Sequence, residues 1–391
     1  MPTDPIDHAV PHRSSVPANK DRMVNLFVRE YDGTPENTPP HKRRCVLMLH
    51  GRTIPVLAIY DTGAGDRSWA QELAKTGYDV FLMDLQGMGR SPRPEMHTPC
   101  NANPAHHARA LTPNLPLTAD CPVGYPHQLG NSQTDWDEVH TVVTFIKNRH
   151  GVDAVDMIGN SAAAMALGPY SIQYPDNVRS LMLQGPVFKP DGPDSAAGTD
   201  FGAPSPLPLS TPAAQWGFPM GLGTKAGLEA AWQNEVDATC PDQKDPYAVD
   251  LVWQVMMDSD DKGRDWGKVL PNGKPEGLSR QRNTFWWGWN KKTAPLHGVL
   301  GGPVPVCLVV GELDKTVTTN GLSVIELYKA VAGPDKLLFK VACASHQWPW
   351  EAQRTTLHKM SHQWLKQNAV FGRTSGSWYV DKGGSVSPWP V

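Results

Sequence analysis

Several short, strongly apolar runs recur along the 391-residue chain, and they constrain its fold more than any other feature of the sequence. Many of them are nearly continuous in Val, Leu, Ile and Met and do not alternate with polar residues. Strands that are buried on both faces of a mostly parallel sheet have this composition. The runs lie at 24–28, 45–49, 80–85, 154–158, 180–183, 306–310 and 337–341.

Amphipathic helix patterns follow several of these runs. Ser68 is placed to cap a helix over 69–76, and Asp135 is placed to cap a helix that ends at Gly151. Two further patterns lie at 320–331 and 350–367. This alternation of strands and helices predicts a doubly wound, mostly parallel α/β sheet.

Two long stretches break the alternation. Residues 92–134 are rich in proline and show no sustained period, so we expect a long loop. Residues 188–296 hold seven of the fourteen tryptophans, namely Trp216, Trp232, Trp253, Trp266, Trp286, Trp287 and Trp289. An aromatic insertion between core strands would cover the crevice at their carboxyl ends, although most of these tryptophans could also fill a small core of their own. We interpret 188–296 as a helical lid between two core parts, 1–187 and 297–391.

Ser161 is the strongest candidate for a functional residue. It follows the apolar run at 154–158 and lies among small residues, in the order Gly159-Asn160-Ser161-Ala162-Ala163. A nucleophilic serine needs a sharp turn from strand to helix, usually written G-x-S-x-G, which exposes its hydroxyl. Alanine stands here in the last place of that pattern. The alternative interpretation is a serine that caps an ordinary helix.

Residues that could complete a catalytic triad follow the last two core strands. Asp314 comes shortly after the run at 306–310, and His346 after the run at 337–341. The order serine, acid, histidine is the one that an α/β-hydrolase arrangement requires. Asp314 is preferred as the acid, and Glu312 is the fallback.

Two backbone N–H groups are candidates for an oxyanion hole. Ala162 follows the serine at the start of a helix, where the helix dipole also favours negative charge. The turn His50-Gly51-Arg52 ends an early strand, and Arg52 would supply the second N–H group. A simple turn is the alternative interpretation of His50-Gly51.

Together with the turn from Asp84 to Ser91, these residues resemble the α/β-hydrolase superfamily across nearly the whole chain. That turn is similar to the superfamily's D-x-x-G-x-G-x-S pattern. The resemblance implies an α/β-hydrolase fold. Within the superfamily, 80–94, 285–290 and 341–351 resemble a group of largely uncharacterised lidded hydrolases whose elbow reads more like G-W-S-Q-G.

We therefore predict a serine hydrolase that cleaves a carboxylic ester or lactone of a bulky apolar or aromatic small molecule, through an acyl-enzyme on Ser161. Asn160, Trp286, Trp287 and Trp348 are predicted to contact the substrate. Two alternatives stay open: a carbon-carbon bond hydrolase, lyase or isomerase that uses the same triad, and a non-catalytic ligand-binding protein on this fold.

The composition restricts the partners. Charged residues make up 19% of the chain and the net charge is -3, which disfavours a nucleic-acid partner. The predicted triad chemistry requires no metal or organic cofactor. The clustered histidines His97, His106, His107 and His127 match no common zinc spacing, so no metal site is expected there. No run approaches eighteen apolar residues and the start does not resemble a secretory signal, so we expect a cytoplasmic protein without a membrane partner. The sequence carries no signal for an oligomeric state.

The six cysteines form two groups. Cys45, Cys307 and Cys343 lie in apolar strands and are expected to be buried, whereas Cys100, Cys121 and Cys240 lie in loops. Only the loop cysteines are expected to be able to pair. A disulfide between Cys100 and Cys121 would imply an oxidising compartment and a removed leader, and free thiols are the default expectation.

Overall fold

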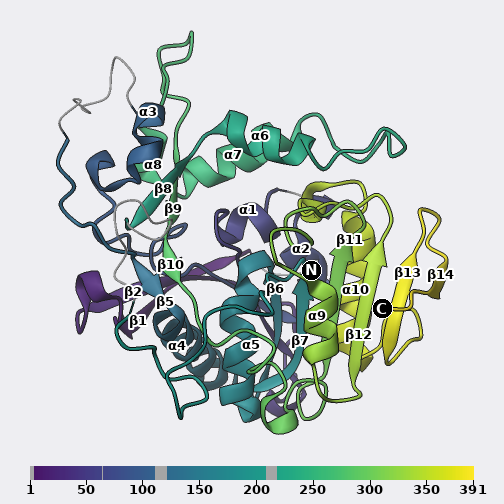
Figure 1. Ribbon diagram of the computed structural model, residues 1–391. Helices are drawn as coiled ribbons and strands as arrows, with labels where there is room; N and C mark the ends of the chain where they lie inside the picture. The colour runs from purple at the N-terminus through teal and green to yellow at the C-terminus, as the bar shows by residue number, and fades with distance from the viewer. Residues whose placement is uncertain (1–3, 64, 111–120, 208–217) are drawn as a thin grey trace.

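A ten-stranded sheet forms the centre of the computed structural model, which describes residues 4–63, 65–110, 121–207 and 218–391 (Figure 1). The strand order is β1-β2-β4-β3-β6-β7-β11-β12-β13-β14. The strands are β1 Ile6–Arg13, β2 Met23–Tyr31, β3 Cys45–Leu49, β4 Asp79–Met83, β6 Val155–Asn160, β7 Val178–Gln184, β11 Val306–Gly311, β12 Lys336–Val341, β13 Gly376–Val380 and β14 Val386–Pro388. All neighbours from β4 to β13 pair in parallel, which confirms the predicted sheet.

Three strands at the edges of the sheet were not predicted. Strand β1 pairs antiparallel with β2, and β14 pairs antiparallel with β13. Most residues of these three strands are exposed or only half-buried. An edge strand that faces solvent does not need a continuous apolar run, so the signal that revealed the central strands is missing here.

Helices cover both faces of the sheet (Figure 1). One face carries α4 Ser132–His150, α5 Ala164–Gln173 and α9 Val324–Ala330, and the other carries α1 Val56–Tyr60, α2 Trp69–Ala74 and α10 Arg354–Gln367. Each set packs its apolar stripe on the fully buried strands and forms a separate core. The fold is therefore doubly wound, as the sequence predicts.

The predicted helix ends were only partly right. The Ser68 side chain accepts a hydrogen bond from Gln71 N, as expected for a cap. Asp135 does not cap α4, because that helix begins one turn earlier and Asn131 caps it together with Thr134. Asp135 is instead buried and accepts two hydrogen bonds of 2.7 Å from Arg282.

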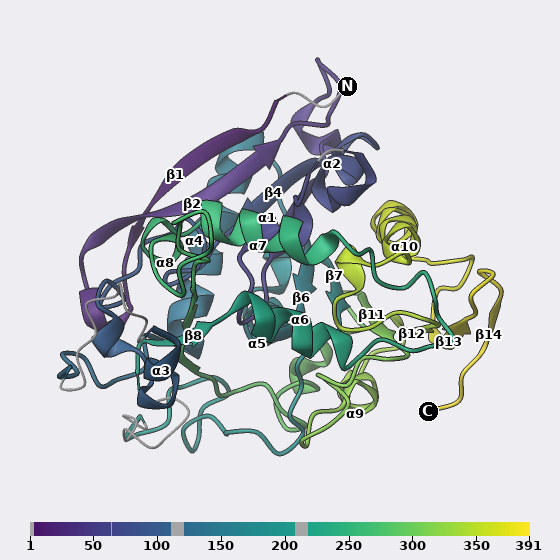
Figure 2. The same cartoon turned by 90° about the horizontal axis from the view of Figure 1, so that it is seen from above.

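The insertion 188–296 leaves the sheet after β7 and returns before β11. It contains α6 Lys225–Gln233, α7 Ala248–Asp258, α8 Asp261–Arg264 and the strands β8 Met220–Gly223, β9 Ser279–Arg282 and β10 Thr284–Phe285. Strands β8 and β9 pair with each other, and β10 pairs with β5 Gly130–Asn131 of the core. Seen from above, α6 and α7 lie across the sheet (Figure 2). Trp216 lies outside the described residues.

The loop 92–134 contains short helical turns, including α3 His107–Ala110, and its residues 111–120 lie outside the described part of the chain. Cys100 and Cys121 form a disulfide within this loop. A second disulfide joins Cys240 of the insertion to Cys343. The expectation of free thiols in the loops is therefore wrong, as is the restriction of pairing to loop cysteines. No described helix is long and apolar enough to cross a bilayer.

Candidate active site

Ser161 lies at a sharp turn between β6 and α5. Its φ of 55° is in the left-handed region, which costs free energy for a residue with a side chain. Ala163 has φ of −54°, so its position does not require glycine. The close approach of strand and helix is made possible by Gly159, where an added Cβ would lie 3.0 Å from the Ala163 Cβ. The alanine in the last place of the elbow pattern therefore fits.

The loop after β3 packs against this turn. A Cβ added at Gly51 would lie 3.0 Å from the Ser161 Cβ and 2.9 Å from Asn160 Oδ1. His50 Nδ1 donates to Gly51 O at 2.6 Å, and Leu85 N donates to His50 Nε2 at 3.1 Å. Burial lowers the pKa of His50, which favours this neutral tautomer. The ring thus connects the loop after β3 to the turn after β4.

The turn after β4 is organised by Asp84. Its Oδ1 accepts a hydrogen bond from Val56 N at 2.9 Å, and its Oδ2 accepts one from Arg90 N at 3.0 Å. Gly89 has φ of 47°, and an added Cβ there would lie 1.8 Å from Asp84 Oδ2. The glycine is therefore required by both backbone conformation and space.

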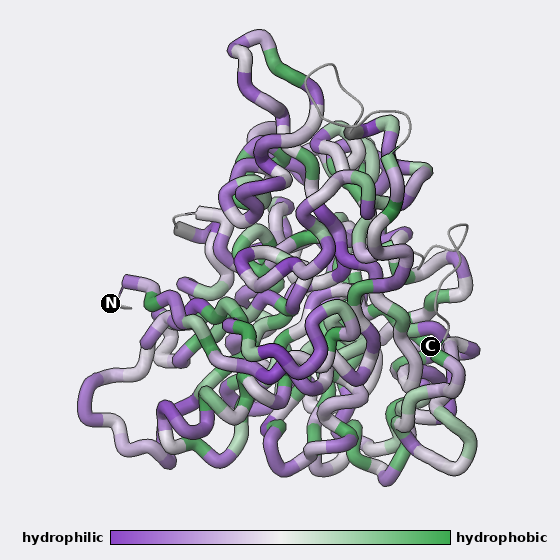
Figure 3. The backbone as a smooth tube through the Cα atoms, turned by 90° about the vertical axis from the view of Figure 1, so that its left-hand side faces the viewer, coloured by the Kyte–Doolittle hydropathy of each residue, from purple (hydrophilic) through white to green (hydrophobic). Residues whose placement is uncertain are grey.

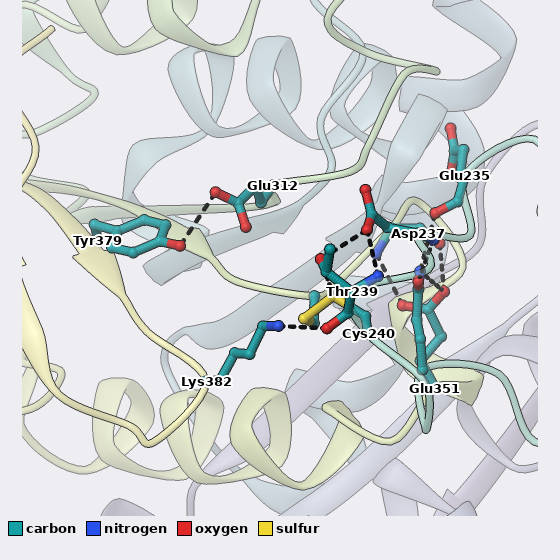
Figure 4. The surroundings of a disulfide bond; sticks show 11 residues. Glu235, Asp237, Thr239, Cys240, Glu312, Glu351, Tyr379 and Lys382 are labelled. Carbon is teal, nitrogen blue, oxygen red and sulfur yellow. Dashed lines mark hydrogen bonds between the residues drawn. A yellow bond between two sulfur atoms is a disulfide. The ribbon is translucent and has the colours of Figure 1, made fainter.

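His346 and Asp314 are joined by a hydrogen bond. His346 Nδ1 donates to Asp314 Oδ2 at 2.9 Å, and Asp314 is buried. Burial lowers the pKa of His346, but the charge and hydrogen bond of Asp314, with the charge of Glu235, outweigh burial and raise it. Glu312 is exposed, and its Oε1 accepts a hydrogen bond from the hydroxyl of Tyr379 at 3.1 Å (Figure 4).

Ser161 and His346 both line a cavity of about 830 Å³. The sequence-predicted residues Arg52, Asn160, Ala162, Trp286 and Trp287 also line it. The Ser161 hydroxyl forms no hydrogen bond with His346 in the described structure, although both line the same space. Catalytic hydrogen bonds are often long before substrate binds.

Trp348 lies outside this cavity, so the structure does not place it in contact with a substrate. Its side chain is fully buried, and its Nε1 donates to Gln353 O at 2.8 Å. Trp350 lines the cavity instead. The two residues belong to one short 3-10 turn, and nothing in the sequence Trp-Pro-Trp distinguishes which ring faces the cavity.

The rest of the lining is largely apolar, with a basic component. Apolar lining residues that the sequence did not single out include Ile54, Met165, Leu228, Met256, Phe285 and Leu322, and Trp253 and Trp289 of the insertion line the cavity as well. Arg52, Arg109 and Lys189 also line the cavity, and none of the described lining residues is Asp or Glu. The cavity therefore suits a neutral or anionic molecule with a large apolar part better than a cation.

Two of the four clustered histidines of the long loop, His106 and His107, form hydrogen bonds with the backbone. Leu222 N donates to His106 Nδ1 at 3.0 Å, and His107 Nε2 donates to Ala102 O at 2.9 Å. These bonds fasten the loop to β8 and to itself.

Comparisons with known proteins found several similar chains. A relative from Sus scrofa, 1-acylglycerol-3-phosphate O-acyltransferase ABHD5, is 24% identical over 287 residues, which cover 70% of this chain and 68% of that protein. A serine hydrolase from Cycloclasticus zankles has a TM-score of 0.50 at 14% identity, covering 93% of this chain and 98% of its own. A thermophilic esterase from Thermogutta terrifontis has a TM-score of 0.46 at 13% identity, covering 93% and 99%. The model of the alpha/beta hydrolase fold family matches residues 45–346, so the chain belongs to that family.

Proposed function

We propose that the protein is a serine hydrolase that cleaves a carboxylic ester or lactone of a bulky apolar or aromatic small molecule. The observation that carries the proposal is the strained turn that presents Ser161 to the cavity shared with His346, whose Nδ1 is bound by Asp314. Strain of this kind is retained where function needs it.

In the proposed reaction, Ser161 Oγ attacks the substrate carbonyl carbon while His346 Nε2 takes the hydroxyl proton. His346 then gives that proton to the leaving alcohol, which stays attached to the acyl group when the substrate is a lactone. Asp314 accepts the Nδ1–H bond and stabilises the imidazolium that forms. A water molecule, deprotonated by His346, then attacks the acyl carbon, and the acid leaves as His346 returns the proton to Ser161 Oγ.

The negative charge on the carbonyl oxygen needs donors that are already in place. We assign this role to the backbone N–H groups of Ala162 and Arg52, one from each side of the serine turn. The close packing of Gly51 against Ser161 supports this assignment, because it brings the Arg52 loop next to the reacting oxygen. We further propose that the insertion acts as a lid, since Trp253, Trp286 and Leu228 contribute to the cavity.

Labelling with a fluorophosphonate tests the proposal directly. We expect stoichiometric labelling of the wild type and none of Ser161→Ala. Ser171→Ala is the matched control, because Ser171 lies in the same α5 region but its hydroxyl donates to Leu167 O inside the helix. Absence of labelling in folded wild-type protein would favour a non-catalytic ligand-binding protein.

A panel of aryl esters, alkyl esters, lactones and diketones identifies the bond that is cleaved. Hydrolysis of esters or lactones of large apolar acids supports the proposal. Turnover confined to the diketones would instead identify a carbon-carbon bond hydrolase.

A further inference from the structure

We propose that Glu235 is a positioning residue, through which the insertion sets the spacing between Asp314 and His346. The proposal rests on the proposed function, in which these two residues form the general base. It concerns a carboxylate that lies outside the cavity lining and that the triad mechanism does not use.

Glu235 follows α6 and is buried, with 4% of its surface exposed. Its Oε1 accepts hydrogen bonds from Lys315 N at 2.9 Å, Thr316 N at 3.1 Å and Thr316 Oγ1 at 3.0 Å. Its Oε2 accepts a hydrogen bond from His346 N at 2.8 Å. One carboxylate of the insertion therefore connects the loop after β11 to the loop after β12.

These contacts bear directly on the catalytic pair. Lys315 is the residue after Asp314, and the fourth bond comes from His346 itself. Hydrogen bonds to an ionised acceptor are stronger than neutral ones, and a buried carboxylate that loses its donors is costly. The carboxylate thus holds both backbones at a fixed separation, and its negative charge helps to raise the pKa of His346.

Glu351 and the disulfide provide a second attachment, but to the histidine loop alone (Figure 4). Glu351 accepts from Ser345 N at 2.8 Å and from Gln243 Nε2 of the insertion at 2.9 Å. The disulfide joins Cys240 to Cys343 in the same region. Glu235 differs from both because it contacts the aspartate loop as well.

Two variants separate the geometry from the charge. Glu235→Gln keeps the size of the side chain but places an NH₂ group against N–H donors and removes the charge. We expect kcat to fall about ten- to a hundred-fold, as a small misplacement of catalytic groups does, with KM nearly unchanged. The acid limb of kcat/KM moves to lower pH, because the His346 imidazolium loses a stabilising negative charge.

Glu235→Asp keeps the charge but shortens the side chain. We expect it to lower kcat while the acid limb stays at the wild-type pH. The control is Asp237→Asn, two residues away in the insertion, where the carboxylate accepts bonds from Thr239 N and Thr239 Oγ1. That variant should match the wild type in both kcat and pH profile, and thermal melts establish which variants fold.

NMR titration of the His346 ring, assigned with His346→Ala, measures the same pKa without turnover. The pKa should fall in Glu235→Gln and stay in Glu235→Asp. Folded Glu235 variants with wild-type kcat and an unmoved His346 pKa would overturn the proposal. The same holds if kcat falls in Cys240→Ser but in neither Glu235 variant. A wild type that neither cleaves esters nor reacts with the fluorophosphonate overturns the hydrolase function, while the NMR titration still decides the role of Glu235.

Discussion

The core and the insertion are held in place by a different balance of apolar packing and buried charge. In the core, the central strands are completely buried and pack apolar side chains on both faces of the sheet. Apolar side chains of the insertion also pack into both hydrophobic cores, and buried ion pairs add directional attachments to the core, such as Asp260 with Arg93 and Arg282 with Asp135. Figure 3 shows hydrophilic and apolar stretches in close alternation along the chain in the upper part of the molecule, where α6, α7 and α3 lie (Figure 1).

This difference affects what each region can contribute to a site. Apolar burial is not directional, so it stabilises the core without fixing the position of a single polar atom. A buried ion pair adds little net stability, but removing one partner is costly because the other charge stays buried. The insertion is thus suited to hold loops in one arrangement, as Glu235 does, whereas the core supplies the nucleophile.

The largest expected effect tests the core side of the comparison. Ser161→Ala and His346→Ala should each lower kcat by several powers of ten, and the double variant should lose little more, because triad residues act as a unit. Initial rates on the best ester from the panel measure these losses. Losses that add in full would contradict the assignment of both residues to one triad.

The parts of the site that come from the core could be predicted from the sequence. Continuous apolar runs identify β3, β6, β11 and β12, and chemically distinctive residues follow their carboxyl ends. Because parallel strands end at one edge of the sheet, Ser161 and His346 had to lie near each other. The preference for Asp314 over Glu312 also agrees with the observed contact to His346.

The contributions of the insertion could not be predicted in the same way. Asp135 was interpreted as a helix cap, but its partner Arg282 lies 147 residues further along the chain. Glu235 contacts loops 80 and 111 residues away, and Cys240 pairs across 103 residues. Pairings over such distances leave no periodic pattern in one sequence, so only the folded structure reveals them.

The two disulfides provide the next test, because they close loops of very different length. Cys240–Cys343 has a separation of 103 residues and Cys100–Cys121 a separation of 21. The entropy of loop closure predicts that replacing the first pair by serine lowers stability by about 4.7 kcal/mol, and the second by about 3 kcal/mol. Urea unfolding measures both losses.

Equal losses in the two disulfide variants would mean that residual structure in the unfolded chain, and not loop length, sets their effect. Blocking of free thiols before reduction, followed by mass spectrometry, counts the disulfides in protein purified from its source. Four thiols protected until reduction are expected, which fits folding in an oxidising compartment.

The buried pair between Arg282 and Asp135 tests the attachment of the insertion. Arg282→Met leaves Asp135 as a buried carboxylate without its main partner. We expect the free energy of unfolding of the insertion to fall by about 3–5 kcal/mol. Arg13→Met breaks an exposed pair with Asp21 and should cost less than about 1 kcal/mol. If the two variants unfold alike in urea, buried charge does not hold the insertion to the core.

The smallest expected effect separates two adjacent tryptophans of the insertion. Trp286 is half-buried at the cavity, and its Nε1 donates to Asp135 at 3.1 Å. Trp287 is almost fully buried, and its Nε1 donates to Phe201 O at 3.1 Å.

Trp286→Phe should therefore raise KM for an aromatic ester about five-fold, equivalent to about 1 kcal/mol, with little change in melting temperature. Trp287→Phe should lower the melting temperature more than it changes KM, because it leaves a buried carbonyl without its donor. The reverse pattern, measured by kinetics and thermal melts on the same preparations, would show that Trp287 and not Trp286 contacts the substrate.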